Sequence, residues 1–422
     1  MQNSVFVLDT NKQPLSPCRP SIARKLLRDE KAAVYRRFPF TIILKRAVEL
    51  SSPISPVTLK VDPGSKTTGI ALVQDGKVIF AAELEHRGQA IKDALESRRA
   101  IRRGRRNRNT RYRQARFLNR TRPKGWLAPS LKSRVDNIQT WFTRFLRLCN
   151  VQSISMELVR FDLQLMQDAE ISGVEYQQGE LKGYEVREYL LEKFDRKCCY
   201  CGKTGIPLEV EHITPKSKGG SNRVSNLCLA CRDCNQRKGN QTATEFGFPK
   251  IQAQAKKPLK DAAAVNSVRW AVYGMFKAAG LPVEVGTGGR TKFNRIKQDY
   301  TKAHWIDAAC VGESGANVSI SATVPLRIKA MGRGKRQMVT TDAHGFPNAS
   351  PKQRNKDGWV TGDMASANVE TGKCSGVYRL GRVIAKAKAT VFVPAGWAYK
   401  DRIQINSKYL KAIHRCDGYT YS

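Results

Sequence analysis

Residues 58–81 have the sequence TLKVDPGSKTTGIALVQDGKVIFA, and this stretch decides the fold class of the chain. Three short strand-like runs, 58–62, 69–73 and 77–81, are separated by two turns that contain glycine. This spacing predicts three consecutive strands that form an antiparallel meander. The first run ends in Asp62, so we expect a carboxylate at the end of the first strand.

The segments on both sides of this meander alternate between strand-like and helix-like patterns. Residues 151–157 are rich in β-branched side chains and end in Glu157, whereas residues 131–148 carry apolar side chains at three- and four-residue steps. The other predicted elements are strands at 5–9, 41–44 and 283–285 and helices at 21–31, 261–279 and 301–310. This order predicts an α/β chain with several units.

The composition limits the classes of protein to consider. At roughly 150 residues per domain, 422 residues predict about three folded units. The chain has 74 Lys+Arg against 36 Asp+Glu, a net charge of +38, so we expect it to neutralise a polyanion, most often nucleic acid. It has no run of 18 apolar residues and no signal-peptide pattern, which argues against membrane insertion and secretion. We expect a cytoplasmic, nucleoid-associated protein of a prokaryote.

Arginine dominates one segment. Between residues 98 and 120 there are 11 arginines in 23 residues and no acidic residue. The sparse apolar side chains form no continuous stripe, so a helix here could not bury itself in a protein core. We predict a helix about 35 Å long, at ~1.5 Å per residue, that lies along phosphates. Its candidate nucleic-acid-binding residues are Arg98, Arg99, Arg102, Arg103, Arg105, Arg106, Arg108, Arg111, Arg113, Arg116 and Arg120.

Cysteines gather in a second segment. Six of the 11 cysteines lie within residues 198–234, and four of these form two CxxC pairs: Cys198, Cys201, Cys231 and Cys234. Two such pairs supply the four tetrahedral thiolates of a closed structural zinc site, which suits a reducing cytosol better than disulfides do. Cys199 and Cys228 lie in the same cluster and leave the choice of ligands open.

Polar residues with a recognisable order lie between and just after the two pairs. They are Glu211, His212, Asn226 and Asn235, and their arrangement resembles the ββα-metal motif of HNH endonucleases. The resemblance implies that His212 is the general base that activates water and that Glu211 and Asn235 hold one Mg²⁺ ion. It also implies that Asn226 orients the loop and His212. Most family members have Asp where Glu211 stands, so the longer side chain is a departure.

Four residues from three distant segments form another candidate site: Asp62, Glu157, His304 and Asp307. His304 and Asp307 are three residues apart and therefore share one face of the predicted helix. The set resembles the constellation of RuvC and other RNase H-like nucleases. The resemblance implies that Asp62, Glu157 and Asp307 hold two Mg²⁺ ions, which clamp the attacking and leaving oxygens of a phosphodiester. His304 would activate water or assist the leaving group.

The order of these segments resembles the IscB family, the transposon-encoded RNA-guided DNA nucleases of OMEGA systems, which are related to type II CRISPR effectors. Pro14-Leu15-Ser16-Pro17 also resembles the family's Pro-Leu-Met-Pro motif, with Ser16 as a departure. The implied fold is α/β multidomain, with an RNase H-like (RuvC) domain that is split by an Arg-rich bridge helix and by an inserted, zinc-stapled HNH domain. The implied units are an N-terminal PLMP-like domain at 1–55, RuvC segments at 56–90, 123–168 and 247–315, the bridge helix at 91–122, the HNH domain at 169–246 and a basic, β-rich C-terminal domain at 316–422.

The resemblance implies an RNA-guided DNA endonuclease that works as a monomer in a ribonucleoprotein. Its partners would be a structured guide RNA encoded near the gene and a double-stranded DNA target beside a short motif, which the C-terminal domain would recognise. The HNH site would cut the guide-paired strand and the RuvC-like site the displaced strand.

Two alternatives stay open. A protein-only HNH restriction or homing-type endonuclease would explain the zinc and His212, but not the set formed by Asp62, Glu157, His304 and Asp307. A non-catalytic RNA-binding protein would explain the charge of +38 but neither candidate metal site. A defined structured RNA that copurifies with the protein would favour the RNA-guided enzyme, whereas random fragments would favour the alternatives.

Overall fold

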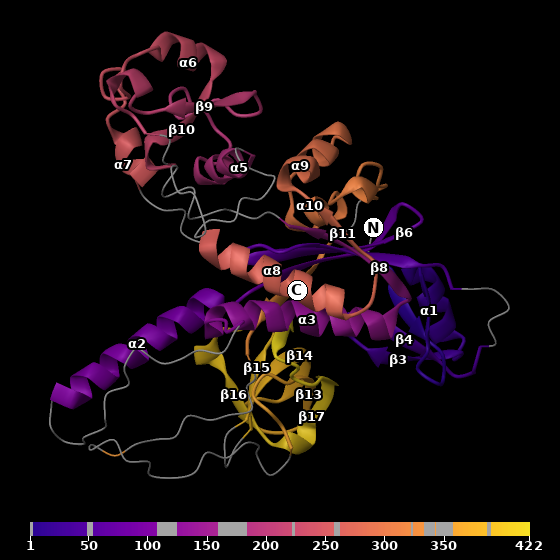
Figure 1. Cartoon of the computed structure of the whole chain (residues 1–422). Coiled ribbons are helices and arrows are strands. Elements are labelled where there is room, and N and C mark those ends of the chain that lie inside the picture. Colours follow the sequence, from indigo (N-terminus) through magenta and orange to yellow (C-terminus); the bar gives the residue numbers. More distant parts are fainter. Residues whose placement is uncertain are drawn as a thin grey trace.

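The computed structural model describes residues 3–48, 54–107, 125–158, 184–221, 224–256, 262–321, 324–332, 342, 358–385 and 390–422. Its strands form four sheets, of which the largest has seven strands. Figure 1 shows this central sheet with one group of elements projecting above it and another, built from the C-terminal residues, packed below. The chain is therefore a multidomain α/β protein, as the sequence predicts. None of the described helices is long and apolar enough to cross a bilayer.

A small sheet forms the N-terminal unit. Its elements are β1 (Val5–Leu8), β2 (Pro14–Cys18), α1 (Pro20–Arg28), β3 (Ala32–Arg36) and β4 (Thr41–Leu44), and the strand order is β2-β1-β4-β3. Val5, Val7, Ala23 and Ile42 form its buried core. The predicted strands at 5–9 and 41–44 and the helix at 21–31 are confirmed to within a few residues.

The central sheet contains the meander. Strands β5 (Val57–Asp62), β6 (Thr67–Gln74) and β7 (Lys77–Glu85) are antiparallel neighbours, as predicted. Strands β8 (Val151–Glu157) and β11 (Val283–Gly286) extend the sheet beyond β5 in parallel. The other edge carries β12 (Leu326–Ala330), parallel to β7, and then β18 (Tyr419–Tyr421). The strand order is β11-β8-β5-β6-β7-β12-β18.

These last two strands correct one expectation. The sequence predicts that residues 316–422 form a separate unit, yet β12 and β18 from this region belong to the central sheet. Backbone hydrogen bonding of β12 to β7 and of β18 to β12 decides their placement, because neither strand has a local pattern that would assign it to one sheet or another. The separate C-terminal sheet contains β13 (Met364–Val369), β14 (Gly376–Ala385), β15 (Thr390–Pro394), β16 (Ile403–Ile405) and β17 (Leu410–His414).

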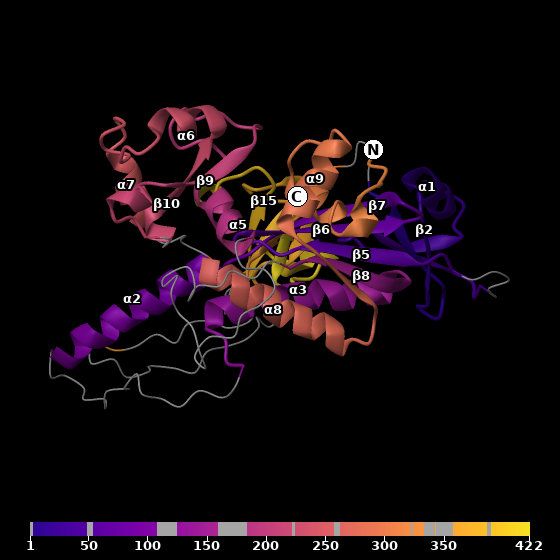
Figure 2. The same ribbon diagram turned by 45° about the horizontal axis from the view of Figure 1, so that its top comes forward.

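Helices cover both faces of the central sheet. On one face lie α3 (Pro129–Leu148) and α8 (Ala262–Ala278), whose apolar sides bury Trp141, Phe145 and Phe276 against the strands. On the other lie α9 (Gly288–Lys297) and α10 (His304–Ala309), where Trp305 and Ile306 pack on β6 and β7. Figure 2 shows α3 and α8 below the strands and α9 above them. The helix predicted at 301–310 is shorter than expected because Ala303 is extended.

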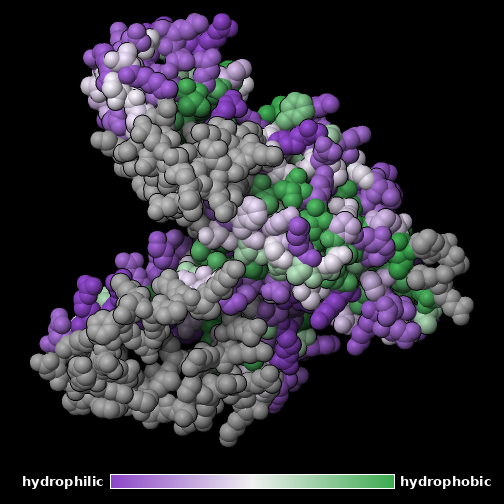
Figure 3. All heavy atoms as spheres, in the orientation of Figure 1, coloured by the Kyte–Doolittle hydropathy of each residue, from purple (hydrophilic) through white to green (hydrophobic). Residues whose placement is uncertain are grey.

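Helix α2 (Gly88–Asn107) leaves the central sheet after β7 and extends away from it (Figure 1). It begins ten residues before the predicted arginine-rich helix at 98–120, and residues 108–124 lie outside the described part of the chain. In Figure 3 the visible part of α2 is coloured hydrophilic.

The projecting group consists of α5 (Tyr184–Lys193), β9 (Leu208–His212), β10 (Leu227–Cys231), α6 (Arg232–Lys238) and α7 (Lys250–Lys256). It has a core of its own, in which Ile251 and Ala255 of α7 take part. The structure therefore extends this unit past residue 246, where the sequence places its end. Short 3-10 helices lie at Lys216–Lys218, Val224–Asn226, Glu313–Gly315, Tyr399–Asp401 and Ser407–Tyr409.

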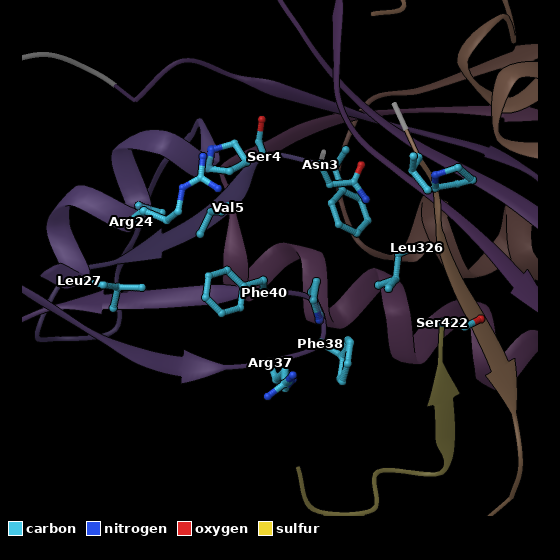
Figure 4. Close-up of a pocket in the computed structure, with 16 residues that line it drawn as sticks. Asn3, Ser4, Val5, Arg24, Leu27, Arg37, Phe38, Phe40, Leu326 and Ser422 are labelled. Carbon is cyan, nitrogen blue, oxygen red and sulfur yellow. The ribbon is translucent and has the colours of Figure 1, made fainter. Parts of the chain in front are cut away.

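Ionic contacts join the N-terminal unit, α3 and the C-terminal residues. Oδ2 of Asp417 accepts a hydrogen bond from Nη2 of Arg36 at 2.8 Å and lies 3.1 Å from Nη2 of Arg144. A cavity of about 450 Å³ lies beside this junction, with Phe40 and Leu326 among its lining residues (Figure 4). Its lining contains no acidic side chain and is separate from the sites described next.

Candidate metal centres and nucleic-acid interface

The sheet brings two predicted carboxylates together. Asp62 is the last residue of β5 and Glu157 the last of β8, and these strands are parallel neighbours with Val61 opposite Met156. Both side chains therefore lie at the same edge of the sheet. His304 and Asp307 come from α10, and with the two strand carboxylates they line one cavity of about 510 Å³. Four residues from three distant segments thus meet in one place.

A glycine permits this approach of α10 to the sheet. A Cβ built on Gly69 of β6 would lie 1.9 Å from the carbonyl oxygen of His304, far inside van der Waals contact. Only a residue without a side chain allows the first turn of α10 to sit this close to the strand. Gly69 thereby helps to set the position of His304 and Asp307 relative to Asp62.

Two arginines pair with the acids of this cavity. Nη2 of Arg269, on α8, lies 2.8 Å from Oε1 of Glu157 and 3.6 Å from Oδ1 of Asp62. Nε of Arg295, on α9, lies 2.7 Å from Oδ1 of Asp307. Sequence patterns gave no sign of either arginine, since each reaches the cavity only through the packing of its helix.

Burial and neighbouring charge both act on Asp307. Loss of solvent raises the pKa of its carboxyl group, the guanidinium of Arg295 opposes that rise, and the carboxylate of Glu157 adds to it. The net direction is upward. A cation bound among the carboxylates would reverse this balance by favouring the charged form.

The donor set fits a hard divalent cation. Three carboxylates, Asp62, Glu157 and Asp307, line one cavity, and carboxylate oxygens are the ligands that Mg²⁺ prefers. Each of the three lies within 3.6 Å of a guanidinium, which offsets its negative charge.

A buried lysine network lies beneath the same edge of the sheet. Lys60 precedes Asp62 by two residues, so it faces the same side of β5, and its Nζ donates to the carbonyl of Val311 at 2.9 Å and to Oγ of Ser314 at 2.6 Å. Burial lowers the pKa of Lys60 to about 8, against the opposing effect of Glu284. The network ties the segment after α10 to β5, and strand alternation alone could have indicated the side that Lys60 faces.

The second site lies on the hairpin of β9 and β10. His212, the last residue of β9, is half-buried and lies opposite Leu227. Glu211 forms an ion pair with Lys238 of α6, at 2.6 Å from Oε1 to Nζ, and Lys238 also donates to the carbonyl of His212 at 2.8 Å. Lys238 is 1% exposed, so it joins α6 firmly to the end of β9. The sequence analysis did not identify Lys238.

The two predicted asparagines make different contacts. The side chain of Asn226 accepts from the backbone N–H of Thr214 at 2.9 Å and donates to the carbonyls of Thr214 and Ser221. It therefore fastens the loop that follows His212. Asn235, on α6, donates to Oε2 of Glu209 at 2.7 Å. This bond uses only the amide nitrogen of Asn235.

Four cysteines form a compact cluster in the same unit. The Sγ atoms of Cys198, Cys201, Cys231 and Cys234 all lie within 4.8 Å of one another, and the pair from Cys201 and Cys231 is 3.8 Å apart. Tetrahedral coordination with Zn–S bonds of about 2.3 Å requires sulfurs about 3.8 Å apart, so the cluster fits zinc.

The structure also settles the open choice among the clustered cysteines. Cys228 is fully buried, and its Sγ lies 3.6 Å from the hydroxyl of Tyr200. Cys199 interacts with Cys228 through their side chains. Both belong to the apolar core of the unit and lie outside the four-sulfur cluster.

Arginines of α2 form the candidate nucleic-acid interface. Arg98, Arg99, Arg102 and Arg103 are exposed on this helix. Arg105 and Arg106 lie within its bounds, whereas the remaining predicted arginines fall outside the described residues: Arg108, Arg111, Arg113, Arg116 and Arg120.

Solved structures similar to the chain include two of Streptococcus thermophilus Cas9, in complex with the GGAA PAM (14% identity, TM-score 0.23) and with the AGAA PAM (13%, 0.22). Each match covers 61% of this chain and 32% of that one. The type II-C Cas9 enzyme from Actinomyces naeslundii is 20% identical, with a TM-score of 0.16 and coverage of 46% and 26%. The chain thus spans about a third of the first two proteins, and TM-scores this low carry no argument about its fold. No curated protein matches the chain.

Two family models match parts of the chain. Residues 5–179 match the RRXRR protein family, and they include Arg102-Arg103-Gly104-Arg105-Arg106 of α2, which has the pattern of the family's name. Residues 198–241 match the HNH endonuclease family and span the cysteine cluster, β9, β10 and α6. The predicted HNH motif is confirmed. The chain therefore combines a region that matches the RRXRR family with one that matches the HNH endonuclease family.

Proposed function

We propose that the chain is an RNA-guided DNA endonuclease with two nuclease sites, one for each DNA strand. The observation that carries this proposal is the cavity at the edge of the central sheet, because it unites Asp62, Glu157, His304 and Asp307 from segments 95 or more residues apart in the same chain as an HNH domain. An HNH enzyme that works alone has no need of this second set of acids.

The order of the central strands supports an RNase H-like (RuvC) assignment for this sheet. Three antiparallel strands come first, parallel β8 and β11 follow on one side, and carboxylates end β5 and β8. We infer that α2 and the HNH domain are insertions into this domain, after β7 and after β8 respectively. This is the organisation of the IscB family, and the transposon-associated OMEGA system is the setting we propose for the chain.

At the sheet edge, Asp62, Glu157 and Asp307 would hold two Mg²⁺ ions, which supply charge stabilisation at the attacking and leaving oxygens of the phosphodiester. His304 lines the same cavity and is the residue able to move a proton to or from the reacting oxygen. Arg196, Lys197 and Lys292 also line it and would attract the DNA backbone. We propose that this site cuts the displaced strand.

In the HNH domain, His212 would accept a proton from the attacking water. Glu211 and Asn235 would hold one Mg²⁺ ion, which stabilises the leaving oxygen. Asn226 fixes the loop after His212, and Lys238 donates a hydrogen bond to the backbone carbonyl of His212. These contacts hold the backbone that positions the imidazole. Zinc on the four cysteines would join the segment at 198–201 to the end of β10 and the start of α6. We propose that this site cuts the guide-paired strand.

Charge supports the RNA partner. The exposed arginines of α2 project from the body of the chain, and the net charge of +38 needs a polyanion of comparable size. A structured guide RNA along α2 supplies that anion, while base pairing supplies the sequence specificity. The C-terminal sheet and the N-terminal unit would then contact RNA and the short motif beside the target.

Sequencing of the RNA that copurifies with the protein tests this function. The gene is expressed with its flanking DNA, and the RNA is extracted, sequenced and compared with random cellular fragments. We expect one defined RNA, and replacement of its guide segment should redirect Mg²⁺-dependent cutting to the matching plasmid. Random fragments, together with cutting that persists after the RNA is digested, would instead support a protein-only HNH enzyme.

A further inference from the structure

Arg269 occupies an unusual place among the charged residues of the sheet-edge cavity. It comes from α8, on the face of the sheet opposite α10, and reaches around the edge to the ends of β5 and β8. Its side chain is 4% exposed. Nη2 lies 2.8 Å from Glu157 and 3.6 Å from Asp62, and Nε donates to the carbonyl of Pro63 at 3.1 Å. One guanidinium thus offsets two carboxylates that would otherwise repel each other.

The guanidinium is nevertheless incompletely satisfied in this position. Nη1 is buried and has no hydrogen-bond partner in the described part of the chain. A buried donor without a partner carries a desolvation penalty. The two carboxylates and one hydrogen bond to the carbonyl of Pro63 keep the group in place, and a cation that neutralised the carboxylates would remove its ionic partners.

Metal ions and Arg269 need the same oxygens. A divalent ion on Asp62 and Glu157 would stand close to the guanidinium of Arg269, whose side chain is 4% exposed, and like charges repel more strongly away from water. Arg295 pairs with Asp307 in the same manner, so all three candidate ligands have an arginine within 3.6 Å. The cavity is charge-compensated before any ion enters.

We propose that Arg269 is a resident counter-cation that competes with the divalent ion for Asp62 and Glu157, and so limits metal loading of this site. Without metal it keeps the carboxylates assembled; on loading it must give up its contact with them. This inference rests on the proposed function, because it takes the sheet-edge cavity as a metal site. It assigns Arg269 a positioning role that opposes metal binding.

Titration of Mn²⁺ into the full-length protein, followed by electron paramagnetic resonance of the free ion, tests the proposal without any cleavage reaction. The binding that is lost in Asp62→Ala belongs to this cavity. The Arg269→Gln variant should bind Mn²⁺ in this cavity about 5- to 150-fold more tightly than the wild type does, the range typical of coupled sites. Arg144→Gln is the matched control, because it removes another arginine that is mostly shielded from solvent and paired with an acid, outside the lining of the cavity, and it should leave the affinity unchanged.

The direction of the change separates competition from a purely structural role. A structural arginine would leave the affinity unchanged or weaken it when removed, and either result in folded Arg269→Gln overturns the proposal. Should Arg269→Gln fail to fold, Arg269→Lys keeps a charge with a single donor group and should show a smaller rise in affinity; no rise would count against competition. If Asp62→Ala removes no Mn²⁺ binding at all, the failure lies with the metal site of the proposed function.

Discussion

Gly69→Ala tests how closely α10 must approach the sheet. The added Cβ would lie 1.9 Å from the carbonyl oxygen of His304, whereas ordinary van der Waals contacts begin at 3.4 Å, so α10 must retreat by about 1.5 Å. A misplacement of about 1 Å typically costs an active site on the order of 10²-fold in rate. We therefore expect cleavage of the displaced strand to fall about 10²-fold or more, while cleavage of the guide-paired strand by the HNH domain stays unchanged.

The assay follows both strands of one end-labelled target in a single reaction, so the HNH product reports folding and target binding. Overpacking should also lower stability by about 1–3 kcal/mol, which a melting curve measures. Gly274→Ala is the matched control, since it adds the same methyl group on α8 where no atom lies within 4 Å. Equal displaced-strand rates for Gly69→Ala and Gly274→Ala would refute the placement of His304 and Asp307.

Three further predictions concern the other parts of the chain. Metal analysis should find about one zinc per chain, and Cys231→Ser should remove it and unfold the HNH domain, because structural zinc contributes folding free energy; active protein free of zinc would contradict this. Lys238→Met should leave the mostly buried carboxylate of Glu211 without its ion-pair partner, at a cost of about 3–5 kcal/mol in stability. Hydrogen exchange in β9 and α6 should then be faster, and unchanged exchange would contradict this role of Lys238. The double variant Arg102→Gln and Arg103→Gln should lower the slope of log RNA affinity against log salt by the equivalent of about two phosphate contacts, without changing the target sequence. An unaltered slope would argue against an α2–RNA interface.

Local sequence patterns were sufficient for the elements that carry the acids. The meander and the strand at 151–157 follow from β-branched runs with turn residues between them, and a parallel pair necessarily places Asp62 and Glu157 at one edge. The two CxxC pairs likewise define a four-sulfur cluster by spacing alone. These features could be predicted because each depends on neighbours in the sequence.

Features that depend on distant packing could not be predicted in this way. Arg269 and Arg295 look like ordinary basic positions on helices, and only the crossing of α8 and the placement of α9 bring them to the acids. The strands β12 and β18 are short and have no pattern of their own, so only the pairing of β12 with β7 and of β18 with β12 reveals their sheet. Lys238 is the last residue of α6 and looks like an ordinary basic position at a helix end. Only the packing of α6 against β9 brings it to Glu211.

Strand-specific cleavage by two single variants tests the division of labour most directly. A supercoiled target labelled on either strand is incubated with guide RNA, Mg²⁺ and either Asp62→Ala or His212→Ala. Each substitution should cost at least about 10²–10⁴-fold at its own site. Asp62→Ala should nick only the guide-paired strand, and His212→Ala only the displaced strand. Loss of cutting on both strands in either variant while RNA and DNA binding persist, or double-strand breaks from both variants, would contradict a chain with one nuclease site for each strand.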